Sequence, residues 1–451
     1  MEEIWVLRNR RIKINHILKR LISSIFVRNL FIVMSGTASG QIIGFFLSPI
    51  ISRFYSPSDF GIFGSFNAVV SVIGAGITLD YSQAIMLPKE KEDAFYIFII
   101  SCMNSLFIGL LIAIMCLIIP EKIRNLIKIR EYWIFIILTL VIIIFGISQS
   151  LQAWCVRYKA FNKTSISQIV RSISSNTSQI GLGYLKSGYR GLIISSFLAD
   201  ILSGIVLIKK IIPDAILYGR NINLRRIKEL FLEYKDFPMY SASQNVINAL
   251  SNGLPVLLLA NFYGIAVAGA YAFGMRLLHT PMGIISSSLR QVLFQKASEI
   301  HNQGESLFPI YWKSTFGLFA IIFFPGIILF IWAPEIFSFI FGMQWNLAGQ
   351  LAKWLILWMM FAFCNLPAIL FSRIIRIQRK VFFYDLALLF FRTMTLILGG
   401  LYLTALNTII LFSFVGAIMN LFLIIIVGKA VIRKEYVYKK NKNMKINYPK
   451  Y

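Results

Sequence analysis

The sequence predicts an all-α integral membrane protein with about twelve transmembrane helices in two pseudo-symmetric halves of six and with both termini in the cytoplasm. Hydrophobic residues make up 57% of the 451 residues and charged residues only 14%. A soluble domain of this size cannot bury so much apolar surface, so we expect lipid to be the solvent. Two further observations, the number of apolar stretches and the positions of the basic residues, support this fold class.

Crossing about 30 Å of hydrocarbon takes roughly 20 helical residues. Apolar stretches near this length recur along the chain, and we expect one helix from each of 30–52, 60–87, 94–119, 132–152, 165–185, 190–208, 238–260, 266–289, 312–332, 351–371, 381–403 and 407–430. No small-residue cleavage site follows the first stretch, so we expect no cleaved signal peptide.

The Lys and Arg residues determine the orientation. An even number of spans places both termini on one side, and basic residues favour the cytoplasm. With the termini inside, the cytoplasmic segments hold 33 of the 45 Lys and Arg residues, whereas the outer segments hold 7. The net charge of +26 therefore follows from topology, and we expect no nucleic-acid partner.

An internal repeat divides the chain. At an offset of 208 residues, "FYSPSDFGIFG" (54–64) aligns with "FYGIAVAGAYA" (262–272), and Gly61 then matches Gly269. Six helices in each half predict a parallel repeat with a substrate path between the halves. The expected segments are a basic N-terminal segment, a first half, a basic cytoplasmic linker, a second half and a basic cytoplasmic tail, at 1–29, 30–208, 209–237, 238–430 and 431–451.

Polar residues at membrane depth indicate a cavity. In the fifth span one stripe carries Gln168, Arg171, Ser175 and Gln179 at helical spacing, and Arg276 lies near the middle of the eighth. Gln168, Ser175 and Gln179 either contact a polar substrate or join helices. An arginine cannot lose its proton, so Arg171 and Arg276 predict a cationic cavity for an anionic substrate.

Other charged residues complete the set of candidates. Arg290 ends the eighth span at the cytoplasmic side, and Arg53 lies in the first outer hairpin, where it either lines the mouth of the cavity or has no role in transport. Seven residues separate Asp385 and Arg392, which therefore share a helix face and are expected to pair or to line the path. Asp200 is a candidate partner for Arg171, and Asp80 lies near the cytoplasmic end of the second span.

No enzyme is expected. The longest outer loops, 120–131 and 333–350, are too short for a catalytic domain, and the chain has no P-loop and no paired-carboxylate motif. The cysteines form no CxxC pair and no metal-ligand cluster is apparent, so we expect no metal and no cofactor. If a proton or sodium gradient drives transport, Asp80, Asp200 and Asp385 are the carboxylates that could titrate.

Three stretches resemble one family. They are the first hairpin "SPIISRFYSPSDFGIFGSF" with the following "AIMLPKEKEDA", then "NKTSISQIVRSISSNTSQ", and finally "AYAFGMRLLHTPMGIISSSLRQVLFQKASE" at 270–299. Together they are similar to the Wzx-type O-antigen repeat-unit flippases, polysaccharide biosynthesis proteins of the MATE-like MOP superfamily. One departure is "LDYSQAIMLP": this chain has Asp80 and Ser82 where family members often have a basic residue and then an acidic one, so a role of that family arginine does not transfer.

The resemblance implies a function. Such flippases move an oligosaccharide, linked by diphosphate to a polyprenyl (undecaprenyl) carrier, across the bacterial inner membrane by alternating access. It implies that Arg276 and Arg171 attract the diphosphate, that the serine- and glutamine-rich wall contacts sugar hydroxyls, and that membrane lipids and a polymerase with its chain-length regulator are partners. The alternatives are a MATE-like exporter of another lipid-linked precursor or a drug, an O-unit polymerase or ligase, and a scaffold for an assembly complex.

Overall fold

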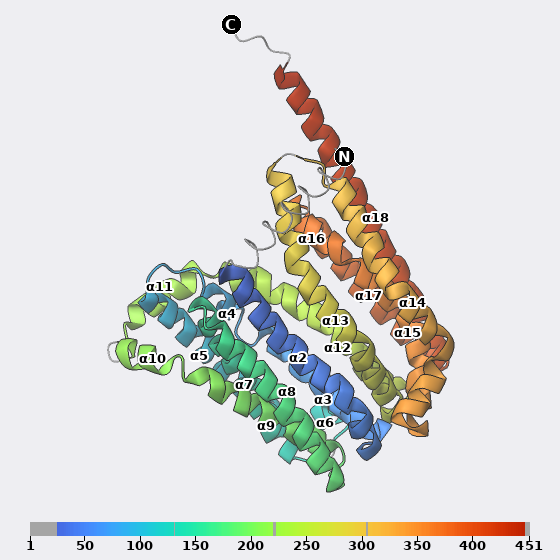
Figure 1. The fold of residues 1–451 in the computed structure, drawn as a ribbon. Helices are drawn as coiled ribbons and strands as arrows, with labels where there is room; N and C mark the ends of the chain where they lie inside the picture. Colours follow the sequence, from blue (N-terminus) through green and yellow to red (C-terminus); the bar gives the residue numbers. More distant parts are fainter. Residues whose placement is uncertain (1–24, 130, 220–221, 304, 447–451) are drawn as a thin grey trace, which may run out of the picture.

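A computed structural model describes residues 25–129, 131–219, 222–303 and 305–446, and within these ranges the regular secondary structure is helical. The predicted basic segment before residue 25 and the last residues of the predicted tail lie outside the described residues. The described chain begins and ends at the same end of the molecule, on which α2 starts and α18 finishes (Figure 1). This agrees with an even number of spans.

The first half contains six long helices. Their bounds are α2 (Ile25–Phe54), α3 (Pro57–Gly76), α5 (Lys91–Ile118), α7 (Trp133–Arg157), α8 (Phe161–Tyr184) and α9 (Tyr189–Ile208). Two short helices, α4 (Tyr81–Ala84) and α6 (Pro120–Ile127), lie in the connections between them. The predicted basic linker forms α10 (Ile212–Tyr218), α11 (Leu224–Glu233) and a π-helical turn over Phe237–Ala242.

The second half also contains six long helices. They are α12 (Ser243–Phe262), α13 (Ile265–Asn302), α14 (Phe308–Phe341), α15 (Asn346–Cys364), α17 (Gln378–Tyr402) and α18 (Ala405–Ile446). A short helix, α16 (Leu366–Ile374), continues α15 after a break at Asn365, and a 3₁₀ turn, Met343–Trp345, precedes α15. The twelve long helices correspond one to one with the predicted spans, which confirms the predicted fold class.

Helix α8 is the most polar of these long helices. By length and composition, eight helical stretches of the described chain are apolar enough to cross a membrane. A polar helix in a membrane must turn its polar side toward protein or a cavity, and α8 lines the first cavity described below.

The helix contacts repeat between the halves. Helix α2 packs extensively on α8, and its equivalent α12 packs on α17. In the same way α5 packs on α7 as α14 does on α15, and α8 on α9 as α17 does on α18. The contacts between the halves repeat as well, because α3 packs on α12 as α13 does on α2. The two halves are thus pseudo-symmetric.

The first outer hairpin starts with a capping box. Ser56 is the N-cap of α3: its Oγ accepts from the N–H of Asp59 (3.1 Å), and its own N–H donates to Asp59 Oδ2 (2.9 Å). The Asp59 carboxylate also accepts from the N–H of Tyr189 at the start of α9 (2.8 Å). Asp59 therefore orders the hairpin. Among the ion pairs of the described residues none joins Asp59 to Arg53, which is exposed.

Two glycines that the repeat aligns meet where the halves cross. A Cβ added to Gly61 would overlap the carbonyl oxygen of Ile265, and one added to Gly269 would overlap that of Pro57 and lie 2.6 Å from the N atom of Gly61. Only glycine allows α3 and α13 to approach so closely. The repeated glycine thus joins the two hairpins at the outer ends of the halves.

The second span differs from its prediction. It was expected to run through 60–87, but α3 ends at Gly76, and Leu79 and Asp80 have left-handed backbone angles (φ +48° and +59°). Such angles cannot continue a right-handed helix. Asp80 therefore lies in a turn before α4, buried at 9% exposure, and not inside a long helix.

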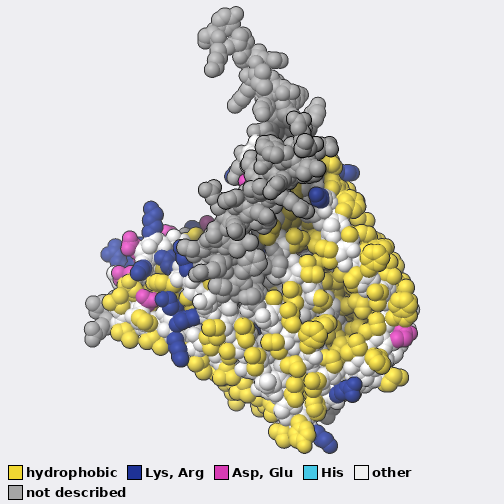
Figure 2. All heavy atoms as spheres, in the orientation of Figure 1, with side chains coloured by type: hydrophobic (Ala, Val, Ile, Leu, Met, Phe, Trp, Pro, Cys, Tyr) yellow, Lys and Arg dark blue, Asp and Glu magenta, His cyan; other side chains and the backbone are white. Residues whose placement is uncertain are grey.

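The charged groups gather at the two ends of the molecule. Figure 2 shows a broad hydrophobic surface, with Lys and Arg clustered around the region where Figure 1 places α10 and α11. There Arg226 of α11 pairs with Asp93 at the start of α5 (2.7 Å). At the outer end, Glu131 accepts from Tyr189 Oη (2.5 Å) and pairs with Arg190 (2.7 Å), and these contacts lower the pKa of Glu131 to about 2.

Candidate functional site

A first cavity, of about 310 Å³, lies where α2, α8, α9 and α13 meet. The spacing of polar residues on α8 predicted this wall correctly, because Gln168, Arg171 and Ser175 all line the cavity. Three residues that the sequence analysis did not select as a site also line it: Gln41, Ser48 and Asn176. The buried Oδ1 of Asn176 has no hydrogen-bond partner among the described residues. The wall therefore offers many hydrogen-bonding groups.

Small residues bring α2 and α8 together at this wall. A Cβ at Gly40 would lie 3.2 Å from Ser172 Cβ, and Ser172 Oγ donates to the carbonyl oxygen of Gly40 (2.5 Å). Small residues and hydroxyl groups commonly join membrane helices in this way. Both serines of this stretch line the cavity: Ser172 also fixes α8 to α2, and Ser175 also accepts from Gln179.

Arg171 is neutralised. Its Nε lies 2.5 Å from Asp200 Oδ1 on α9, and the side chains are 44% and 9% exposed, respectively. This confirms Asp200 as the partner of Arg171. Since the carboxylate offsets its charge, Arg171 adds no uncompensated positive charge to this cavity. This corrects the expectation that Arg171 and Arg276 together make the cavity cationic.

Arg276 has no such partner. It lies 11 residues after the start of α13, about 16 Å along the axis, which places it near mid-membrane depth. No ion pair involving its guanidinium is found among the described residues. A Cβ at Gly44 would lie 4.0 Å from its Nη2. Arg276 therefore faces the point where α2, α8 and α13 converge.

A second cavity, of about 610 Å³, adjoins the first and is bounded mainly by α3, α12 and α13. Both cavities are lined by Gln41, Arg276 and Thr280, so Arg276 lies at their junction. Polar side chains from α3 and α12, Asn67, Ser71 and Asn252, also line the second cavity. Its size is typical of ligand sites in proteins, which run from about 300 to 1,000 Å³.

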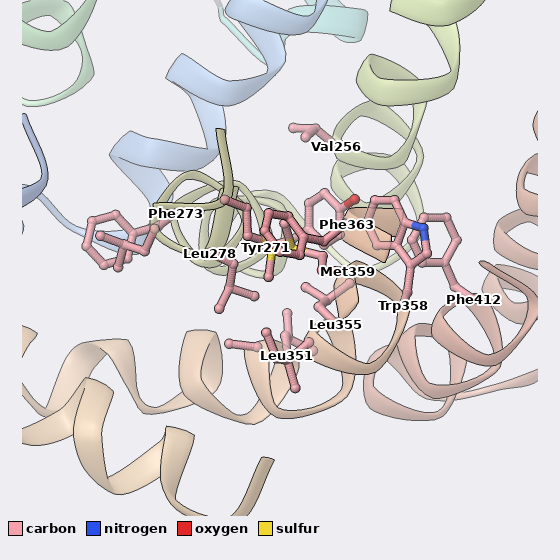
Figure 3. Close-up of a cluster of buried hydrophobic side chains, with 14 of the residues drawn as sticks. Val256, Tyr271, Phe273, Leu278, Leu351, Leu355, Trp358, Met359, Phe363 and Phe412 are labelled. Carbon is pink, nitrogen blue, oxygen red and sulfur yellow. The ribbon is translucent and has the colours of Figure 1, made fainter. Parts of the chain in front are cut away.

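Arg392 of α17 lines the second cavity. The residue is 4% exposed, and its guanidinium carbon lies 4.1 Å from the ring centre of Trp358 and 4.4 Å from that of Phe412. Figure 3 shows these two rings side by side, with Tyr271 and Val256 nearby. A desolvated cation–π contact is worth up to about 2 kcal/mol, and burying an arginine at mid-membrane costs on the order of 3 kcal/mol. The two rings therefore offset most of that cost.

The predicted pairing of Arg392 with Asp385 is wrong. Although both residues are described, they form no ion pair, and Nε and Nη2 of Arg392 are buried without any hydrogen-bond partner. Seven residues span about 10 Å along a helix, so a shared face alone does not bring the side chains together. Asp385 is not among the residues that line either cavity.

Four other candidates lie elsewhere. Arg53 is exposed at the outer end of α2, and Arg290 is exposed on the cytoplasmic extension of α13. Gln179 is buried at 2% exposure and donates to Ser175 Oγ (3.1 Å), behind the cavity wall. Asp80 is in the turn after α3. Among the described residues, no group of three or more His, Cys, Asp or Glu is arranged to hold a metal ion.

Comparison with protein families gives one match. Residues 50–350 match the model of a family described as polysaccharide biosynthesis protein. No curated protein matches the sequence. The matched range includes the first hairpin, helix α8 with Arg171, and helix α13 with Arg276.

Comparison with solved structures gives the fold. The lipid II flippase MurJ in an inward closed conformation is similar with a TM-score of 0.70, at 14% identity, over 93% of each chain. An inward-facing multidrug resistance MATE family transporter of the MOP superfamily has a TM-score of 0.68, also at 14% identity, over 91% of this chain and 99% of its own. An outward-facing structure of such a transporter, with the same identity and coverage, scores 0.61.

Proposed function

Because the chain belongs to the polysaccharide biosynthesis protein family and has the multi-pass fold of MATE-like transporters, we propose that it is a flippase for a lipid-linked saccharide. Its substrate is an oligosaccharide repeat unit linked through diphosphate to a polyprenyl carrier. The protein moves this unit from the inner to the outer leaflet of the bacterial cytoplasmic membrane, for the synthesis of O-antigen, capsule or exopolysaccharide.

One observation carries this proposal: two adjoining cavities near mid-membrane depth share an arginine, Arg276, that has no carboxylate partner among the described residues. In a low-dielectric surrounding an uncompensated cation favours binding of an anion. The neighbouring amides and hydroxyls of Gln168, Ser175 and Asn176 suit the hydroxyl groups of sugars. A substrate with a diphosphate and a glycan needs both kinds of surface.

The cavities also support an alternating-access cycle. The hairpins of the two halves are in close contact at their outer ends, through Gly61 and Gly269. The substrate then enters from the cytoplasmic side, and rocking of the pseudo-symmetric halves exposes it to the outside.

Export of a cationic drug is the second candidate, since MATE family transporters of multidrug resistance have this fold. The sign of the charge disfavours it. Among the described residues that line the two cavities there is no Asp or Glu, whereas Arg171, Arg276 and Arg392 are present. An organic cation would meet repulsion from Arg276 and Arg392 instead of an ion pair.

The test is flipping in proteoliposomes of a fluorescent polyprenyl-diphosphate oligosaccharide. We expect the wild-type protein to move the probe and Arg276→Glu to abolish movement, because an anion replaces the cation at the junction of the cavities. The matched control is Arg290→Gln, on the same helix but outside both cavities, and it should leave the rate within about twofold. Wild-type vesicles that do not flip the probe, or full activity in Arg276→Glu, would overturn the proposal.

A further inference from the structure

Arg392, which lines the second cavity, has buried N–H groups without a hydrogen-bond partner among the described residues. The rings of Trp358 and Phe412 lie against the guanidinium of Arg392, and its Nε and Nη2 have no hydrogen-bond partner although they are buried. The N–H donors of a guanidinium lie in its plane and so remain available when aromatic rings cover a face. Most buried polar groups in proteins are paired, so we expect these N–H donors to form hydrogen bonds to a ligand.

The charges of the two cavities are unequal. In the first, Asp200 offsets Arg171. The charged residues that line the second are Arg276 and Arg392, and His279 and Tyr271 are its other titratable lining residues. No described carboxylate pairs with either arginine. The second cavity therefore carries about two positive charges, and the first adds none beyond the shared Arg276.

The two arginines also lie at similar depth. Arg276 is 11 residues from the outer end of α13, and Arg392 is 10 residues from the outer end of α17. At 1.5 Å per residue both lie about 15 Å from the outer ends of their helices. They reach the second cavity from different helices of the second half.

We propose that the substrate's diphosphate binds in the second cavity between Arg276 and Arg392, and that the glycan occupies the first cavity. This inference rests on the proposed function. A diphosphate that links a lipid to a sugar carries two negative charges, one on each phosphate, which two arginines match. Arginine suits this role because its planar fork binds phosphate oxygens in pairs. Arg276, at the junction, contacts the phosphate that bears the sugar.

The assignment differs from a site between Arg171 and Arg276. Arg171 already donates to Asp200, so phosphate at that position would bring a second anion near the carboxylate. Instead, Arg171 and Asp200 form part of the polar wall on which Gln168, Ser175 and Asn176 face the glycan. Arg392 is thus a specificity-determining residue for the second phosphate.

The test compares two probes that differ by one phosphate: N-acetylglucosamine linked to farnesyl through a diphosphate or through a monophosphate. Binding of each to the purified full-length protein in detergent gives the diphosphate preference. A hydrogen-bonded charge contact predicts a preference of about 10-fold or more in the wild type. In Arg392→Gln this preference should fall below about 3-fold, whereas in Arg290→Gln, a control arginine that lines neither cavity, it should equal that of the wild type.

Measuring two probes with two proteins forms a double-mutant cycle between Arg392 and the second phosphate. A purely structural effect of Arg392 would weaken the binding of both probes equally and would leave the diphosphate preference unchanged. Arg392→Lys keeps the positive charge but lacks the planar guanidinium, and it should give an intermediate diphosphate preference. It replaces Arg392→Gln in the test if that variant does not fold. An unchanged preference in the Arg392 variants, with loss of binding in Arg276→Gln, overturns this site but not the proposed function. If the wild type binds neither probe and does not flip the polyprenyl substrate, both fail.

Discussion

Helices α8 and α17 occupy equivalent places in the two halves, and each carries an arginine at membrane depth. Arg171 on α8 is neutralised by Asp200 of the next helix, α9. Arg392 on α17 instead faces Phe412 of its next helix, α18, and has no carboxylate partner among the described residues. The ion pairs found in the described chain all join residues between 93 and 229.

A pseudo-symmetric fold can thus hold an asymmetric site. Equivalent helices of the two halves each carry an arginine, and the neighbouring residue decides whether its charge is available. A carboxylate leaves a polar, nearly neutral wall, which suits sugar hydroxyls. An aromatic ring stabilises the cation without neutralising it, which leaves the charge for an anionic group.

The largest effect is expected where the halves are alike. In Gly269→Ala the new Cβ would overlap the carbonyl oxygen of Pro57, a backbone atom that cannot rotate away. Overpacking typically costs about 1–3 kcal/mol, and a backbone clash should cost at least about 3 kcal/mol. Thermal unfolding in detergent measures it. The matched control is Gly317→Ala in α14, where no atom lies within 4 Å of the new Cβ; similar melting temperatures for the two variants would show that the close crossing does not stabilise the protein.

The second prediction concerns the two arginines themselves. Arg171→Leu leaves Asp200, 9% exposed, without its partner. Because Arg171 is itself partly exposed, we expect a loss of roughly 2–3 kcal/mol, at the low end for a broken buried pair. The double variant Arg171→Leu/Asp200→Leu should recover most of it. Arg392→Leu orphans no carboxylate and should cost less than Arg171→Leu. The reverse order of unfolding temperatures would contradict the contrast between the halves.

The smallest effect is expected from an ion pair of the first half. Contacts from Tyr189 and Arg190 lower the pKa of Glu131 from 4.5 to about 2. The resulting stabilisation is fully present above pH about 4.5 and is lost as the pH falls toward 2. Solvent screening limits it to about 0.5–1 kcal/mol. The melting temperature of the wild type should therefore exceed that of Glu131→Gln at pH 7, and the gap should shrink by pH 3; a constant gap would exclude this origin.

Much of the site could be predicted because it depends on local patterns. The polar stripe on α8 follows from helical periodicity, which correctly placed Gln168, Arg171 and Ser175 on one cavity. Arg276 stood out because an arginine in an apolar span is costly wherever its helix packs. Gln41 and Asn176 were not predicted as site residues. The signals for them were a glutamine among the glycines of α2 and an asparagine on the cavity-facing side of α8.

Hydropathy and the internal repeat were enough to predict the twelve long helices and the two halves, because both can be read from the sequence without knowing how the helices pack. Which charges are neutralised depends on the packing of the helices. Asp200 and Arg171 are 29 residues apart in the sequence. Arg392 contacts the rings of Trp358 and Phe412, but forms no ion pair with Asp385, which is nearer in the sequence. Such choices depend on how each helix is rotated against its neighbours, and that rotation is set by packing between helices far apart in the chain.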